Sequence, residues 1–238
     1  MNYTPPNPHK ILYEQGLDPD APWTITRAQP IASLVAEGVT AGFTSSRPPP
    51  AVLCGRNIFL HAGAQAEALC RIDQGAREAL ASHEGLLAVR GELPAETEGN
   101  PRRLALLERE PWRDTLERLP QSAIVGKARL IACFKIAAVI IGQDGGRTVY
   151  ADVSTRAQRD ALGVWPDYDK WTGVMAGDWQ RGRWAWFFDT PVAFRGAAIR
   201  PVLGYPGLWR HDRGIAHQQQ KASMEAYHAA VEAQEGGR

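Results

Sequence analysis

Residues 23–62 read WTITRAQPIASLVAEGVTAGFTSSRPPPAVLCGRNIFLHA, an order that predicts a strand, a helix, a proline-rich connection and a second strand. Large and polar side chains alternate from Trp23 to Arg27, which is typical of a short half-buried strand. Pro30 stands where the first turn of a helix tolerates proline, and Gly38 follows the apolar helical spacing as an end signal. We expect these elements to form half of a small β-barrel.

After Gly38 the chain turns small and polar. It runs through VTAGFTSS, residues 39–46, to three successive prolines at 48–50. Proline lacks the amide hydrogen that a central ladder needs, so this stretch predicts a loop or an edge segment. The strand that follows, NIFLHA at 57–62, has apolar residues on both of its faces.

The rest of the chain divides into a helical part and further strands. Alanine, leucine, glutamate and arginine dominate residues 64–118, where glycine and proline break the helical pattern into pieces. We expect a helical insertion there. The run AIVGKARLIACFKIAAVII at 123–141 predicts the main core strand, either as one long bent strand or as two. A turn signal at 143–146, followed by the strand-like RTVYADV, favours a hairpin.

Composition excludes several classes of protein. The 238 residues carry 27 basic and 26 acidic side chains, so no overall field draws the protein to nucleic acid or to an anionic membrane. Cys54, Cys70 and Cys133 match neither a disulfide framework nor a zinc site, and the six histidines show no paired spacing. No apolar run has the length of a signal peptide or a membrane span. We expect a cytoplasmic protein with no metal and no cofactor.

Three separated segments carry a further pattern. The first is TITRAQPIASLVAEG, with a strand-ending arginine, a Gln-Pro pair and a helix that ends in glycine. The second combines CGRNIFLHA with LPQSAIVGKARLIACF, and the third is GDWQRGRWAWFFDTPVAFRGAAIRPVLGYPGLW. Taken in this order, the segments resemble the ASCH domain, a member of the PUA-like superfamily of small β-barrels associated with RNA.

The resemblance implies an α+β protein whose core is a PUA-like mixed β-barrel spanning residues 23–209. The helical insertion at 64–118 interrupts this barrel. An extended N-terminal arm precedes it at 1–22, and a C-terminal helical tail follows at 210–238. The resemblance also implies a pocket between the loop after the glycine-ended helix and the barrel strands, which accepts a nucleotide base or a similar polar ring.

Three positions depart from the pattern of the family members that hydrolyse an acetylated cytidine. Those members carry a lysine two residues after the helix-ending glycine and acidic and basic residues shortly afterwards, where this chain has Thr40, Phe43 and Ser45. A threonine hydroxyl without a nearby base is a poor nucleophile. The leading hypothesis is therefore a noncatalytic module that binds RNA or a nucleotide with a modified base. One alternative is a hydrolase acting on a modified nucleoside such as acetylcytidine, or a weak ribonuclease, with Thr40 as its catalytic residue; the other is a protein-interaction scaffold.

Polar residues near the first strand and helix are the main candidates for the ligand site. Arg27 and Gln29 flank the strand-to-helix junction, where they could hold a phosphate or the edge of a ring. Equally, Arg27 could pair with a core carboxylate and Gln29 could cap the helix. Arg47 is a candidate for a phosphate contact, with an ordinary surface role as its alternative. His61 is a candidate wall of the pocket, although a hydrogen-bonded core histidine is more usual in a strand this apolar.

Aromatic and basic residues interleave in RWAWFFD, residues 183–189. Such interleaving suits single-stranded nucleic acid, although two alternating tryptophans are also typical of a barrel core. We expect at least one of Trp184 and Trp186 in the core, which leaves Arg183 and one tryptophan as candidate contacts. The full set of predicted ligand-binding residues is Arg27, Gln29, Thr40, Ser45, Arg47, His61, Arg183 and Trp186.

Overall fold

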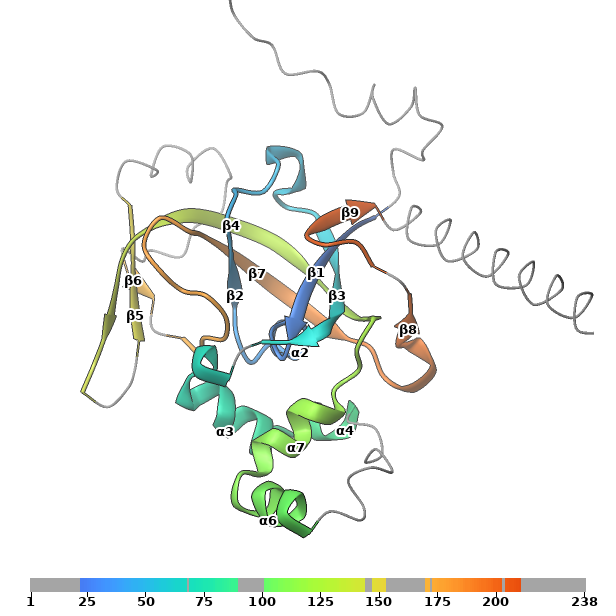
Figure 1. Ribbon diagram of the computed structural model, residues 1–238. Helices are drawn as coiled ribbons and strands as arrows, with labels where there is room; N and C mark the ends of the chain where they lie inside the picture. The colour runs from blue at the N-terminus through green and yellow to red at the C-terminus, as the bar shows by residue number, and fades with distance from the viewer. Residues whose placement is uncertain are drawn as a thin grey trace, which may run out of the picture.

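The computed structural model of the protein describes residues 22–67, 69–89, 101–143, 147–152, 170–171, 173–202 and 204–210. A curled sheet of nine strands frames this part of the chain, with most of the helices gathered at one end (Figure 1). The strands are β1 (Trp23–Gln29), β2 (Gly42–Ser45), β3 (Asn57–Ala66), β4 (Ala123–Ile141), β5 (Arg147–Ala151), β6 (Lys170–Trp171), β7 (Trp184–Ala193), β8 (Arg200–Pro201) and β9 (Leu208–Arg210). The α-helices are α2 (Ile31–Ala36), α3 (Gln74–Ser82), α4 (Glu84–Val89), α6 (Pro101–Arg109) and α7 (Pro111–Arg118).

The sheet has the strand order β2-β7-β4-β3-β1-β9, with β5 and β8 also paired to β4 and β6 paired to β5. Strands β1 and β3 run parallel, with Ile25 beside Leu60, and the other pairs are antiparallel. The sheet curls into a half-barrel around α2 (Figure 1). The α+β class predicted from the sequence is confirmed at this level.

One strand, β4, connects all parts of the sheet. Its 19 residues pair first with β3, then with β7, and at the far end with β5. The register shifts along it are bulges, which let a long strand follow the curvature of the half-barrel. The sequence left open one bent strand or two, and the structure has one. The predicted hairpin agrees with the antiparallel pairing of Ile141 with Arg147.

The short helix α2 fills the hollow side of the half-barrel. All six of its residues are buried, as expected for a helix with no charged side chain. Ile25, Leu60 and Phe43, from β1, β3 and β2, belong to the same apolar cluster. Gly38 follows the helix with a φ of +71°, a conformation that glycine adopts without strain. The chain therefore leaves the helix at the predicted glycine and turns into β2.

Strand β2 occupies the stretch predicted as a loop or an edge segment. It pairs only with β7, with Phe43 opposite Trp186, and stands at the end of the strand order. Phe43 is nevertheless 0% exposed. One large apolar side chain among small ones is enough to hold this short edge strand on the core.

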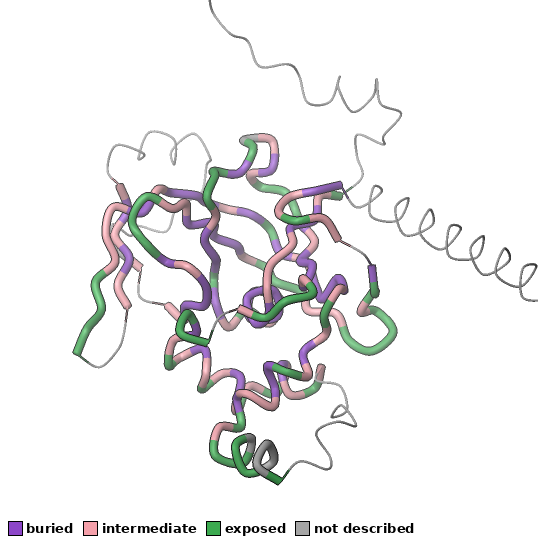
Figure 2. Tube along the Cα trace, in the orientation of Figure 1, coloured by how far each residue is buried: buried purple, intermediate pink, exposed green. Residues whose placement is uncertain are grey.

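The first half of strand β7 buries both of its faces. Trp186 and Phe188 belong to the main cluster around α2, while Ala185 and Phe187 belong to a second cluster that includes Phe134. The predicted alternation is confirmed, and at least one of the two tryptophans, Trp186, lies in the core. Figure 2 shows how the buried residues run along the strands and through α2.

The described helices between β3 and β4 pack at one end of the half-barrel (Figure 1). They occupy residues 74–89 and 101–118, and β3 extends as far as Ala66. Leu80 and Trp112 are buried in the main cluster. The helices between these strands therefore share the core of the half-barrel.

Parts of the predicted organisation lie outside the described residues. These are nearly all of the N-terminal arm at 1–22, the C-terminal tail beyond Arg210, and residues 153–169. None of the helices in the described ranges has the length and apolar character that crossing a membrane requires.

Candidate functional site

Arg27 is a half-buried cation, and two of its buried hydrogen-bond donors are not used within the described ranges. It lies on β1, and its Cζ is 4.1 Å from the centroid of the Phe43 ring. Its Nε and Nη2 atoms are buried and have no hydrogen-bond partner among the described residues. These two nitrogens form one edge of the planar guanidinium, which can donate to two neighbouring acceptor atoms at once. Arg27 therefore has a complete bidentate edge that is buried and has no acceptor among the described residues.

The surroundings of Arg27 oppose its charge. Burial, and after it the positive charge of Arg183, lower the pKa of Arg27 to about 10, against the opposing effect of Glu67. Leaving a buried charged donor without an acceptor costs more than the roughly 1–3 kcal/mol of a neutral one. A ligand that brought acceptor atoms to Nε and Nη2 would remove this cost, which is a physical reason to expect binding here.

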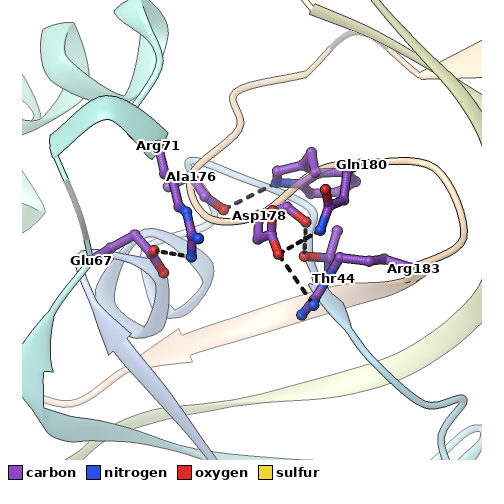
Figure 3. Close-up of polar contacts among 8 residues, drawn as sticks. Thr44, Glu67, Arg71, Ala176, Asp178, Gln180 and Arg183 are labelled. Carbon is purple, nitrogen blue, oxygen red and sulfur yellow. Dashed lines mark hydrogen bonds and ion pairs between the residues drawn. The ribbon is translucent and has the colours of Figure 1, made fainter.

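The segment 173–183, which leads into β7, passes over this part of the core. Thr44 donates a hydrogen bond of 2.9 Å to the carbonyl oxygen of Asp178 (Figure 3). A Cβ on Gly177 would lie 2.8 Å from Ile31 Cδ1, and the φ of Gly177 is +98°, so a glycine is required there. The segment is thus held against both β2 and the first residue of α2.

Charged side chains meet along this segment (Figure 3). The Nη1 of Arg183 is 3.2 Å from Asp178 Oδ2, and the Nη1 of Arg71 is 3.2 Å from Glu67 Oε1. The Nε of Arg183, like that of Arg27, is buried without a partner in the described part of the chain. The Asp73 carboxylate also accepts a hydrogen bond from the Met175 amide of this segment, so guanidinium groups and carboxylates alternate around it.

The Thr40 hydroxyl, the candidate nucleophile, is engaged with the main chain. It donates to the carbonyl oxygen of Val174 at 2.6 Å and lies 3.2 Å from that of Gly42, and the residue is 3% exposed. A carbonyl oxygen can accept a hydrogen bond but cannot serve as a general base. In this arrangement the hydroxyl anchors the segment 173–183 to the end of the loop that follows α2.

Replacing Thr40 by valine tests this anchoring role. We expect Thr40→Val to lower the free energy of unfolding by about 1–2 kcal/mol, because valine keeps the shape but leaves the Val174 carbonyl without its donor. Thr40→Ser keeps the hydroxyl and is the matched control, and we expect it to lower the free energy of unfolding by a smaller amount. Urea unfolding measures both variants. Equal losses would show that the methyl group of Thr40, rather than its hydroxyl, holds the segment.

Gln29 is completely buried and uses its amide within the fold. Its Nε2 donates to the carbonyl oxygen of Pro120 at 2.7 Å and to Ser33 Oγ at 2.9 Å. Its Oε1 accepts a hydrogen bond of 3.4 Å from the Ser33 amide. Gln29 therefore ties the first turn of α2 to the chain just before β4.

Ser45, Arg47 and Trp186 lie together where β2 ends beside β7. The Trp186 indole donates to the carbonyl oxygen of Arg47 at 3.0 Å, and its ring centroid is 5.7 Å from that of Phe43. The Ser45 hydroxyl accepts a hydrogen bond of 3.4 Å from the Arg47 amide. Because Phe43 also contacts the Arg27 guanidinium, the structure brings these residues into one neighbourhood, with the Arg47 side chain exposed at its margin.

His61 lies on the other face of the sheet. It stands beside Thr26 in the parallel register of β1 and β3, and Thr26 points away from Arg27 because side chains alternate along a strand. The ring is 2% exposed, its Nε2 donates to the carbonyl oxygen of Val202 at 2.9 Å, and its Nδ1 is 3.2 Å from Thr26 Oγ1. Burial lowers the pKa of His61, against the raising effect of the bond to Val202. His61 is therefore a hydrogen-bonded core residue apart from the Arg27 site.

Sequence reasoning missed two carboxylates of this site, Glu67 and Asp178. Glu67 lies just after the end of β3, forty positions from Arg27, and no spacing pattern connects the two. Asp178 had a weak signal, because it stands shortly before Arg183 in the third segment of the family-like pattern.

Comparison with models of known protein families finds no family that matches this chain, and a search of the curated proteins finds no match either. Within the described ranges, no three side chains of His, Cys, Asp or Glu are grouped so that they could hold a metal ion. The functional argument therefore depends on the geometry around Arg27.

Proposed function

We propose that the chain is a noncatalytic binding module that holds RNA, or a nucleotide with a modified base, at Arg27. The observation that carries this proposal is the buried edge of the Arg27 guanidinium, whose Nε and Nη2 have no acceptor among the described residues. Nucleotides present pairs of adjacent acceptors that match such an edge, namely two phosphate oxygens or the N7 and O6 of guanine. The resemblance to the ASCH domain of the PUA-like superfamily supports the same class of ligand.

The surroundings of Arg27 favour an electron-rich group. The Arg27 Cζ lies 4.1 Å from the centroid of the Phe43 ring, which covers one side of the guanidinium. Arg27 and Arg183 lie close enough to repel each other, and an anionic ligand between them would reduce that repulsion, although the whole protein is nearly neutral. The proposed interaction is therefore local, with few phosphate contacts.

Binding is favoured over hydrolysis by the threonine hydroxyls of the site. Thr40 and Thr44 both donate to main-chain carbonyl oxygens of the segment 173–183. A nucleophilic hydroxyl needs a base that can accept its proton, and an amide carbonyl does not act as one. These threonines therefore suit a structural role better than a catalytic one.

Titration of the full chain with a short single-stranded RNA tests the proposal. Trp186 packs on Phe43 beside Arg27, so its fluorescence should change as the site fills. We expect saturable quenching at micromolar RNA that weakens between about 50 and 200 mM salt, because phosphate contacts release counterions. Single-stranded DNA and single nucleotides, titrated in parallel, define the preferred ligand.

Two results would contradict this proposal. Absence of fluorescence quenching at micromolar concentrations of RNA and of nucleotides would contradict the proposal that the ligand is a nucleic acid or a nucleotide. Conversion of acetylcytidine to cytidine, abolished in Thr40→Ala, would replace the binding module with a hydrolase.

A further inference from the structure

A pocket of about 400 Å³ opens on the face of β1 and β3 opposite to Arg27. Thr26 and His61 lie on its floor together with Gly63, and Tyr205 forms part of its wall. The volume lies within the range of small-molecule sites, roughly 300–1,000 Å³. Because Thr26 and Arg27 are neighbours on one strand, this pocket and the Arg27 site lie on different faces of β1.

Hydrogen bonds hold the connection between β8 and β9 against the floor of this pocket. His61 Nε2 donates to the carbonyl oxygen of Val202 at 2.9 Å, and Thr26 Oγ1 donates to that of Tyr205 at 2.5 Å. The indole of Trp209 donates to Thr26 Oγ1 at 2.8 Å. The wall is thus formed before any ligand arrives, so binding requires little further ordering of the chain.

Small residues keep the pocket open. A Cβ on Gly204 would lie 2.3 Å from Cε1 of His61, so only glycine lets the β8–β9 connection approach the imidazole so closely. Gly63 and Ala64 of β3 and Ala28 of β1 also line the pocket. Such a floor suits a flat group better than a branched one.

The lining carries no charged side chain among the described residues. Its polar side chains include the amide of Gln65 and the hydroxyl of Ser122, beside the phenol of Tyr205. Burial lowers the pKa of His61 from 6.5, so its ring is neutral at pH 7. Ser122 has a φ of +47°, a backbone conformation that a serine rarely adopts and that is often associated with functional sites.

We propose that this pocket is a second binding site, for an uncharged heteroaromatic ring of nucleobase size. Tyr205 offers an aromatic wall for such a ring, and Gln65 and Ser122 offer donors and acceptors for its edge. An anion finds no cation among the described lining residues, and a large branched ligand would meet the closely packed His61 and Gly204. This site is independent of the proposed function at Arg27, because it uses another face and another kind of interaction.

Titration of the full chain with adenosine, followed by NMR, tests this second site. The Trp209 indole N–H is bonded to the floor residue Thr26, so its resonance reports on the pocket. We expect a saturable shift that is unchanged between about 50 and 200 mM salt, because no phosphate is involved. Ala64→Leu fills the pocket and should lower the affinity for adenosine at least tenfold. Ala66→Leu is the matched control, because Ala66 is on the same strand but outside the lining. This variant should keep the wild-type affinity for adenosine.

The outcomes separate this proposal from the one at Arg27. Adenosine binding that persists in Arg27→Met supports the second site. Loss of adenosine binding in that variant would place adenosine at Arg27 and overturn the proposal of a second site. An unshifted Trp209 resonance at millimolar adenosine, or equal weakening by Ala64→Leu and Ala66→Leu, would also overturn it. If the second site is occupied by a base within a strand, a short oligoadenylate shifts the same resonance; if it takes free nucleosides, only adenosine does.

Discussion

Arg27→Met is expected to weaken RNA binding at least 100-fold while the protein stays folded. The substitution removes both donors of the buried guanidinium edge, each of which would make a charge-assisted hydrogen bond worth about 1.5–3 kcal/mol. Methionine keeps an unbranched apolar stem that can pack on the ring of Phe43. The loss should therefore appear in affinity and not in the fold.

The stability of Arg27→Met should equal or exceed that of the wild type. A buried cation whose pKa is lowered to about 10 destabilises the folded state at every pH below that value. Above about pH 10 the folded state loses the proton before the unfolded state does, so the unfolded state binds more protons and the wild type gains stability as the pH rises. The difference in free energy of unfolding between the wild type and Arg27→Met should therefore narrow above pH 10.

Fluorescence titration with RNA and urea unfolding measure the two effects on the same samples. Arg56→Met is the matched control, because it removes one positive charge from an exposed residue. It should change RNA affinity only slightly. Arg27→Lys keeps the charge without the two-donor edge, and we expect it to bind nearly as weakly as Arg27→Met. If Arg27→Met bound RNA with the affinity of the wild type, Arg27 would not be part of the RNA-binding site.

Elements with a clear period could be predicted from the sequence, because their side chains repeat along one stretch of chain. The alternation in RWAWFFD predicted β7 with at least one tryptophan in the core, and the proline and glycine around α2 predicted where that helix ends. The class of fold follows from such local patterns. Predicting the fold class does not require knowing which distant segments of the chain contact one another.

Contacts between distant segments could not be predicted in the same way. Gln29 was predicted as a ligand or a cap, and its strongest partner is a carbonyl group 91 positions away at Pro120. His61 is held by Val202, 141 positions further along the chain. Glu67, forty positions from Arg27, raises the pKa of that guanidinium against the effect of burial. A spacing pattern along the chain holds no information about such neighbours.

The same long-range packing makes Gly42 the most sensitive position of the edge strand. A Cβ on Gly42 would lie 2.2 Å from the main-chain oxygen of Trp186, and a backbone atom in a paired strand cannot move aside as a side chain can. Gly42→Ala must therefore push β2 away from β7. We expect it to lower the free energy of unfolding by about 3 kcal/mol, at the upper end of the usual cost of overpacking.

Urea unfolding of Gly42→Ala beside Gly75→Ala tests this expectation. The nearest neighbour of the new Cβ of Gly75→Ala is the side chain of Val174, at 3.2 Å, which can move aside, so that variant should stay within about 1 kcal/mol of the wild type. Equal stability of the two variants would show that β2 is not held tightly to β7. Because β2 also carries Phe43 below Arg27, Gly42→Ala should lose RNA affinity together with stability, whereas Arg27→Met should lose affinity alone. That contrast separates a residue that binds the ligand from one that only positions the site.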